Sequence, residues 1–199
     1  MTQIPDINSI RTELNRYQAK RLPLEGNRQA AVCMLLRERN EAEVLLIQRA
    51  FYDDDPWSGQ MAFPGGMREP DDANSRVAAE REALEEISVD LSRHTYVGRL
   101  DDQQGRHAGH PLGLVVSAHV YEISGDIELE PNHEVADVVW TPLSMLFDEA
   151  RATEVRHPRA PDQLFPGIVI NADKQQILWG LTRRFLEAFF QHFNIPRLP

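Results

Sequence analysis

The sequence F-P-G-G at residues 63–66, followed by A-E-R-E-A-L-E-E-I at residues 79–87, decides how this chain arranges its functional groups. The paired glycines permit positive φ angles and let main-chain atoms approach a ligand closely. In the second segment Glu82, Glu85 and Glu86 share one side of a helix, because side chains three and four residues apart are neighbours. Like charges at that spacing repel each other, and a hard divalent cation that also takes phosphate oxygens is the usual compensation. The pattern therefore predicts a metal-dependent phosphate chemistry.

Composition sets the class of protein around this segment. The chain has 199 residues, 42% of them hydrophobic and 26% charged, which suits one sizeable soluble domain. The net charge of −10 argues against a nucleic-acid polymer or a membrane surface as partner. The single cysteine, Cys33, lies in an apolar run and is expected in the core. No apolar stretch is long enough for a membrane span and residues 1–6 do not resemble a secretory signal, so we expect a cytoplasmic protein.

Hydrophobic periodicity predicts strands interleaved with helices. Helices are expected over 6–18, 74–87, 142–146 and 175–193, and strands over 30–36, 43–48, 60–63, 96–100, 113–122 and 135–140. The stretch 101–112, rich in Gly, His and Gln, indicates a long loop of the kind that carries function. This order favours an α/β layered domain with a mixed sheet. We divide the chain into an N-terminal helix and linker over 1–27 and a catalytic domain over 28–199.

The motif resembles the box of the Nudix hydrolases, G-x5-E-x7-R-E-U-x-E-E-x-G-U, where U is aliphatic. Residues 81–89 match its second half, with Ser88 in place of the final glycine. Counting from Gly66, Asp72 falls on the first glutamate position, and one extra residue then precedes Arg81. The resemblance implies an α/β/α sandwich with a mixed central sheet, in which the box forms a loop, a helix and a loop.

The same resemblance implies the roles of the box residues. Glu82 and Glu86 match positions that bind Mg²⁺ or Mn²⁺, Glu85 matches a further ligand or base position, and the carbonyl of Gly66 completes the shell. Arg81 matches a catalytic residue that orients the glutamates through a salt bridge. Metal ions in such a site neutralise a diphosphate and lower the pKa of the attacking water. The proton of this water is accepted either by Glu85 or by a carboxylate outside the box, for which Glu134 is a candidate. The other interpretation of Glu134 is a solvated residue at a strand end.

Two further segments resemble the coenzyme A diphosphatase-type subfamily. These are L-L-I-Q-R-A at 45–50 with G-Q-M-A-F-P-G-G at 59–66, and L-W-G-L-T-R at 178–183. Where the coenzyme A signature carries an arginine four residues before its glycine, this chain has Asp55. Candidate substrate-binding residues are Arg49, Arg68 and Phe63, the two arginines as charge-assisted donors to phosphate.

Three functions remain open from the sequence. The first is a Nudix diphosphatase, a hydrolase acting on phosphorus anhydrides, whose substrate is coenzyme A or a related nucleoside diphosphate derivative. The second shares the chemistry but uses ADP-ribose, NADH or another nucleotide sugar. The third is a module that senses a nucleotide without cleaving it, and the presence of all three box glutamates speaks against it. The phenylalanine-rich terminal helix predicts either a cover for the core or a homodimer contact.

Overall fold

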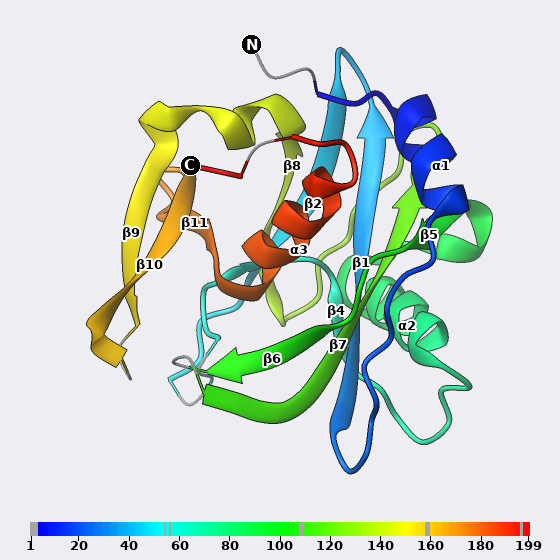
Figure 1. Ribbon diagram of the computed structural model, residues 1–199, viewed down its shortest axis with the longest axis horizontal. Helices are drawn as coiled ribbons and strands as arrows, with labels where there is room; N and C mark the ends of the chain where they lie inside the picture. The colour runs from blue at the N-terminus through cyan, green and yellow to red at the C-terminus, as the bar shows by residue number, and fades with distance from the viewer. Residues whose placement is uncertain (1–3, 54, 56, 108–109, 158–159, 196) are drawn as a thin grey trace.

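The computed structural model describes residues 4–53, 55, 57–107, 110–157, 160–195 and 197–199, in which three α-helices pack around two β-sheets (Figure 1). The larger sheet has the strand order β3-β2-β1-β7-β5, and β4, β6 and β8 pair with β1, β7 and β2 respectively. Its strands are β1 (Arg28–Glu38), β2 (Ala42–Arg49), β3 (Met61–Ala62), β4 (Gly65–Met67), β5 (Thr95–Arg99), β6 (Gln103–His107), β7 (His110–Glu122) and β8 (Val135–Pro142). β1 and β7 run parallel and the other pairs are antiparallel, so the sheet is mixed, as predicted.

The centre of this sheet is buried on both faces. Along β1, Cys33 and Leu35 contribute to one hydrophobic cluster, whereas Met34 and Leu36 contribute to the other. This separation follows from the alternation of side chains along a strand. Because β1 and its neighbours are covered on both sides, their sequences are nearly continuous apolar runs rather than alternating ones.

Helix α2 (Ser75–Ile87) covers one face of the sheet. Asn74 caps its N-terminus by accepting hydrogen bonds from the backbone N–H groups of Arg76 and Val77. Alanines on its buried side, such as Ala79 and Ala83, allow close packing on β1. The helix ends at Ser88, which adopts the left-handed conformation with φ 59° and ψ 30°, a conformation that glycine usually occupies.

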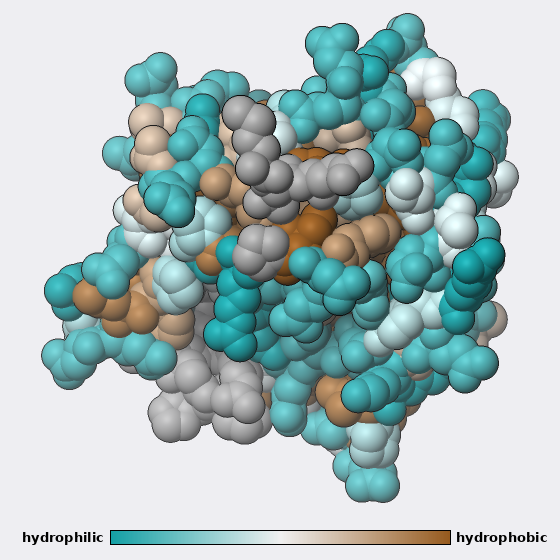
Figure 2. Space-filling view, turned by 45° about the horizontal axis from the view of Figure 1, so that its top comes forward, coloured by the Kyte–Doolittle hydropathy of each residue, from teal (hydrophilic) through white to brown (hydrophobic). Residues whose placement is uncertain are grey.

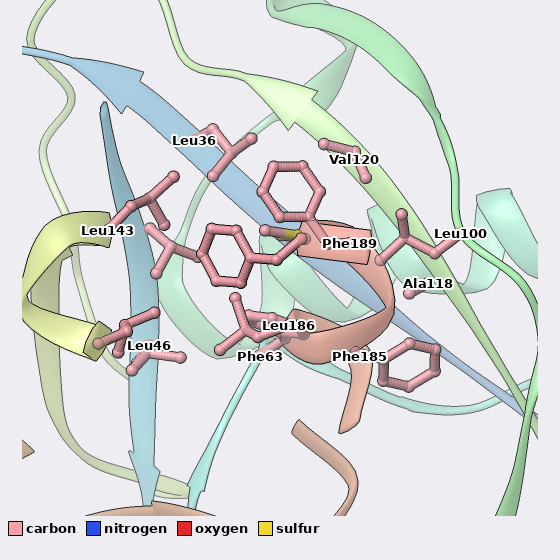
Figure 3. Close-up of a cluster of buried hydrophobic side chains, with 14 of the residues drawn as sticks. Leu36, Leu46, Phe63, Leu100, Ala118, Val120, Leu143, Phe185, Leu186 and Phe189 are labelled. Atoms are coloured by element: carbon pink, nitrogen blue, oxygen red, sulfur yellow. The ribbon is translucent and has the colours of Figure 1, made fainter. Parts of the chain in front are cut away.

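Helices α1 (Ile7–Arg16) and α3 (Gly180–Gln191) cover the opposite face. Figure 3 shows Phe185, Leu186 and Phe189 of α3 packed against side chains of the larger sheet. The three layers confirm the predicted α/β/α sandwich. The division of the chain at residue 27 stays a prediction, and Ile10 of α1 packs into the same hydrophobic cluster as α3.

A second, three-stranded sheet of β9 (Ala152–His157), β10 (Ala160–Asn171) and β11 (Gln176–Trp179) lies beside the larger one. Short 3-10 turns, η1 (Leu91–Arg93), η2 (Leu143–Phe147) and η3 (Glu149–Arg151), complete the chain. The two sheets are joined by the buried Gln176, whose amide donates to Gln48 Oε1 at 3.2 Å and to Asp137 Oδ2 at 2.7 Å. This connection places β11 and the start of α3 next to the ends of β2 and β3.

Several predicted elements need correction. Of the expected loop over 101–112, residues 103–107 form β6 and residues 110–112 begin β7, and the two strands pair with each other; residues 108–109 lie outside the described residues. The predicted terminal helix begins only at Gly180, because residues 176–179 form β11. On α2 the apolar side chains divide, since Ala83 and Ile87 are buried whereas Leu84 is exposed.

The surface is ordinary for a globular protein. On the face shown in Figure 2, hydrophilic side chains predominate and apolar ones occur in separate groups. Among the described residues, no helix has the length and apolar character needed to cross a bilayer.

Candidate active site

The two glycines place the loop before α2 against both the sheet and the helix. Gly65 has φ 152°, and a Cβ there would lie 2.3 Å from the carbonyl oxygen of Ala31 on β1. A Cβ on Gly66 would lie 2.4 Å from Glu82 Oε1 on α2. Only glycine permits both contacts. The main chain of β4 therefore lies directly beside the carboxylate of a predicted metal ligand.

Arg81 is the hub of the charged network. Its Nε and Nη2 donate to Asp72 Oδ1 and Oδ2 at 3.2 and 3.0 Å, and Nη2 also donates to the Met67 carbonyl at 3.0 Å. Nη1 lies 3.1 Å from both Glu82 Oε1 and Glu85 Oε2. The hydrogen bond to Asp72 raises the pKa of Arg81 and lowers that of Asp72. This geometry agrees with the predicted orienting role.

Asp72 reaches Arg81 despite the extra residue that separates them in the box. The Asp72 side chain is 5% exposed and also accepts the Glu69 N–H at 2.8 Å. Since α2 begins only at Ser75, the additional residue is accommodated in the loop over 68–74 and leaves the helical spacing of the glutamates unchanged.

Glu86 is the most buried of the three box glutamates, with 2% exposure. Its Oε2 accepts the Gly65 N–H at 2.8 Å. Burial raises the pKa of Glu86 to about 8, with a further contribution from Glu82, while the Gly65 bond and Arg49 oppose the rise. A carboxylate in this setting is costly to ionise unless a cation approaches it.

Glu82 and Glu85 differ in exposure. The Glu82 side chain is 15% exposed and that of Glu85 is 54% exposed. Burial raises the pKa of Glu82, and the charges of Glu85 and Glu134 add to the increase. Glu134, at the start of β8, therefore acts electrostatically on both Glu82 and Glu86. The structure thus brings into the site the carboxylate that the sequence left open as a solvated strand end.

The donor set suits a hard divalent cation. Glu82 and Glu86 offer carboxylate oxygens and repel each other, Arg81 contacts Glu82 alone of the two, and Gly66 leaves the space beside Glu82 free of a side chain. Within the described ranges, no three His, Cys, Asp or Glu side chains form a preorganised metal cluster. Glu82, Glu86 and Glu85 are the residues that would hold the ion.

A cleft of about 470 Å³ opens beside these residues. Its charged end contains Arg81, Glu82, Glu85 and Glu134. Its other walls are mostly apolar, and their side chains come from the loop before β3, from β7, from the end of β11 and from α3: Trp57, Leu114, Val116, Trp179, Leu181 and Phe185. The arrangement can hold a diphosphate at one end and an apolar or aromatic group at the other.

The three predicted substrate-binding residues occupy different positions. Arg49 lines the cleft. Phe63 also contributes to the cleft wall but is 2% exposed and packs mainly into the core (Figure 3). Arg68 is not brought into the cleft, because its guanidinium donates to the carbonyl of Asp72 and to Gln29 Oε1. Its observed contacts stabilise the loop before α2.

The wall formed by β7 and α3 is the part of the site that sequence reasoning missed. Leu114, Val116 and Phe185 have the spacing of ordinary core residues, and the sequence does not distinguish a cleft wall from a core face. The L-W-G-L-T-R segment was the available signal, since Trp179, Leu181 and Thr182 all line the cleft.

Comparison with known proteins gives consistent matches. A family model described as the NUDIX domain matches residues 26–163. An uncharacterised protein of Schizosaccharomyces pombe is 36% identical over 138 residues, and the match covers 61% of this chain and 41% of that protein. An uncharacterised Nudix hydrolase, NudL, of Yersinia pestis is 28% identical over 196 residues, which cover 97% of this chain and 90% of that protein.

Solved structures with partial similarity include two complexes. A Caenorhabditis elegans Ap4A hydrolase binary complex has a TM-score of 0.49 and 20% identity, covering 59% of this chain and 81% of that one. The NUDIX domain of Shewanella oneidensis NrtR complexed with ADP ribose has a TM-score of 0.46 and 20% identity, covering 65% and 77%.

Proposed function

The chain belongs to the NUDIX domain family, and from that premise we propose that it is a Nudix diphosphatase that hydrolyses the diphosphate bond of coenzyme A or a related nucleoside diphosphate derivative with Mg²⁺ or Mn²⁺. The observation that carries this proposal is that Glu82, Glu85 and Glu134 line one cleft together with mostly apolar side chains, while the charges of Glu82 and Glu134 also act on the buried Glu86. A small-molecule substrate with a charged centre and a large organic group matches such a cleft.

Glu82 and Glu86 are the proposed metal ligands, with Glu85 and the Gly66 carbonyl completing the set. A divalent cation held there supplies charge neutralisation of the diphosphate and acidification of the attacking water. Arg81 keeps Glu82 and Glu85 in place through its 3.1 Å contacts. The Gly65 N–H orients Glu86. The contacts from Arg81 and from the Gly65 N–H matter because carboxylates that are already held in position lose little conformational freedom when the cation binds.

Proton transfer is assigned to Glu134 in preference to Glu85. Glu85 Oε2 already accepts from Arg81. The Glu134 carboxylate has no hydrogen-bond donor among the described residues, and Glu134 lines the cleft. A general base must be able to reach the proton that it removes, and Glu134 has the less encumbered oxygens.

The coenzyme A-type assignment draws on three sequence segments that are far apart in the chain. The end of β2 with Arg49, the stretch around β3 and β4 and the segment over 179–182 all line the same cleft. The three segments that resemble one subfamily in sequence therefore contribute to the same cleft. ADP-ribose, NADH or another nucleotide sugar would satisfy the same charged end and forms the alternative substrate class.

The test is a substrate panel of coenzyme A, ADP-ribose and NADH with Mg²⁺ and with Mn²⁺. We expect wild type to release an adenosine phosphate product from coenzyme A and Glu86→Gln to lose turnover. Glu149→Gln, an exposed glutamate in η3, is the matched control and should retain activity. Turnover of ADP-ribose but not coenzyme A would remove the coenzyme A assignment alone. Absence of turnover for every substrate would leave the non-catalytic nucleotide-sensing module.

A further inference from the structure

Arg49 is one of two cationic side chains among the described residues that line the cleft, the other being Arg81. Arg81 is fully engaged by Asp72, Glu82, Glu85 and the Met67 carbonyl. A substrate phosphate that needs a guanidinium partner would therefore have to use Arg49. Whether the Arg49 guanidinium is already paired with another group before the substrate binds then influences the affinity for the substrate.

Arg49 is held by an acid from the loop that follows β2. Its Nη2 and Nε lie 2.8 and 3.3 Å from Asp55 Oδ2, and the two side chains are 29% and 16% exposed. Asp55 Oδ1 accepts the Trp57 N–H at 2.9 Å. Burial opposes ionisation of Asp55, but the bonds from Arg49 and Trp57 outweigh it and leave its pKa lowered. The ion pair is thus formed at neutral pH.

Among the described residues that line the hollow beside this pair, Arg49 is the only arginine or lysine. A shallow hollow beside the cleft is lined by Arg49, Ala50, Tyr52, Asp55, His133 and Glu134. Two carboxylates face a single arginine there. A phosphate that approaches Arg49 must compete with Asp55 directly, and it also meets the field of Glu134.

We propose that Asp55 is a specificity-determining residue that masks Arg49, so that a substrate phosphate gains the guanidinium only by displacing the Asp55 carboxylate. The inference rests on the proposed function and adds a selection rule to it. Ligands that present a strongly charged diphosphate to Arg49 displace Asp55, whereas weakly anionic ligands leave the pair closed. Asp55 does not touch the reacting atoms and acts through Arg49.

The test measures binding of ADP with Mg²⁺ to wild type and Asp55→Asn by calorimetry, with quenching of tryptophan fluorescence as a second readout because Trp57 and Trp179 line the cleft. Asparagine keeps an acceptor for the Trp57 N–H but removes the charge that holds Arg49. Since a partly exposed ion pair is weak, we expect ADP to bind about three- to tenfold more tightly to Asp55→Asn.

Two controls separate unmasking from a general change of charge. Asp53→Asn removes the same charge from an exposed residue of the same loop, and it should change ADP affinity less than Asp55→Asn does. In an Arg49→Gln background, Asp55→Asn should have no effect, because the group that it unmasks is gone. Thermal unfolding of each variant verifies that the fold is retained.

The outcomes distinguish this inference from the proposed function. Equal ADP affinity of wild type and Asp55→Asn, with turnover of diphosphates intact, would overturn the masking role alone. A gain that persists in the Arg49→Gln background, or that Asp53→Asn reproduces in full, would overturn it as well. Failure of ADP to bind any variant, together with absence of turnover, would contradict the proposed function and the inference with it.

Discussion

Glu86→Gln should make the metal-free protein more stable at alkaline pH. Glu86 has 2% exposure, and burial raises its pKa from an ordinary value of 4.5 to about 8. In the unfolded chain this carboxyl ionises near its ordinary value, so folding takes up a proton between these two pH values. Stability contributed by the neutral form is therefore lost as pH rises from about 4.5 to about 8. Glutamine retains an oxygen for the Gly65 N–H and carries no charge.

The size of the effect follows from the pKa difference. The full difference corresponds to several kcal/mol between the two protonation states, and relaxation of the site reduces it to about 2–4 kcal/mol at pH 8.5. For a chain of this length that is a rise in Tm of about 5–10 °C for Glu86→Gln over wild type. At pH 5 the two proteins should have nearly equal Tm values.

The assay is thermal unfolding in EDTA from pH 5 to pH 8.5. Glu85→Gln is the matched control, because its side chain is 54% exposed and its removal should change stability little. Addition of Mn²⁺ at pH 8.5 should raise the Tm of wild type and have a much smaller effect on Glu86→Gln. Ionisation of Glu86 does not destabilise the fold if the Tm of wild type fails to fall across this pH range, or if Glu86→Gln is less stable than wild type at pH 8.5.

Four further substitutions test separate parts of the structure. Gly66→Ala places a methyl group against the flexible end of Glu82, so activity should fall at least about tenfold with little loss of Tm. In Gly65→Ala the added methyl group meets main-chain atoms at an unfavourable φ. This variant should lose about 2 kcal/mol or more of stability in an unfolding assay. Ser88→Gly relieves a left-handed residue at the end of α2 and should stabilise the protein by about 0.5–1 kcal/mol in urea denaturation; a loss of stability would show that the Ser88 bond to the Glu130 carbonyl matters more. Glu134→Gln should lower kcat by about 10²-fold or more with a small change in KM. If Glu134→Gln instead retains kcat and Glu85→Gln loses it, the general base is Glu85.

Sequence patterns predicted the elements whose burial is simple. β1 and β2 are continuous apolar runs around a polar turn, and α2 has an Asn cap and a glycine pair before it, so local signals and tertiary packing agree. The helical spacing of Glu82, Glu85 and Glu86 likewise survives in the fold, because an insertion in the preceding loop cannot alter distances within a helix.

The second sheet was not predictable on the same grounds. The first half of β10 is largely exposed and carries Pro161, Asp162 and Gln163, which break the alternation that marks a strand, and β9 is a short strand with Val155 as its one large aliphatic residue. The strand β11 merges in sequence with α3, since its Ile177 and Leu178 also fit the helical period. These strands form through pairing with one another and through the Gln176 connection to the larger sheet, which are contacts that local sequence does not encode.

The distinction between Arg49 and Arg68 shows the same limit within the site. Both flank segments that carry the family resemblance, and both are cationic. The Arg68 guanidinium donates to the carbonyl of Asp72 on the loop before α2, whereas Arg49 lines the cleft and forms an ion pair with Asp55. Partners contributed by nearby loops decide the role of each arginine, and their geometry appears only in the folded chain.

We propose that the glutamates at the cleft direct a water molecule to a phosphorus atom of a diphosphate. The most direct measurement is hydrolysis of coenzyme A in water enriched in oxygen-18 with Mg²⁺ or Mn²⁺, with the products analysed by mass spectrometry. Wild type should incorporate one labelled oxygen into one of the two phosphate-containing products, and Glu86→Gln should form neither product above background. Label in a non-phosphate group, or undiminished hydrolysis by Glu86→Gln, would contradict it.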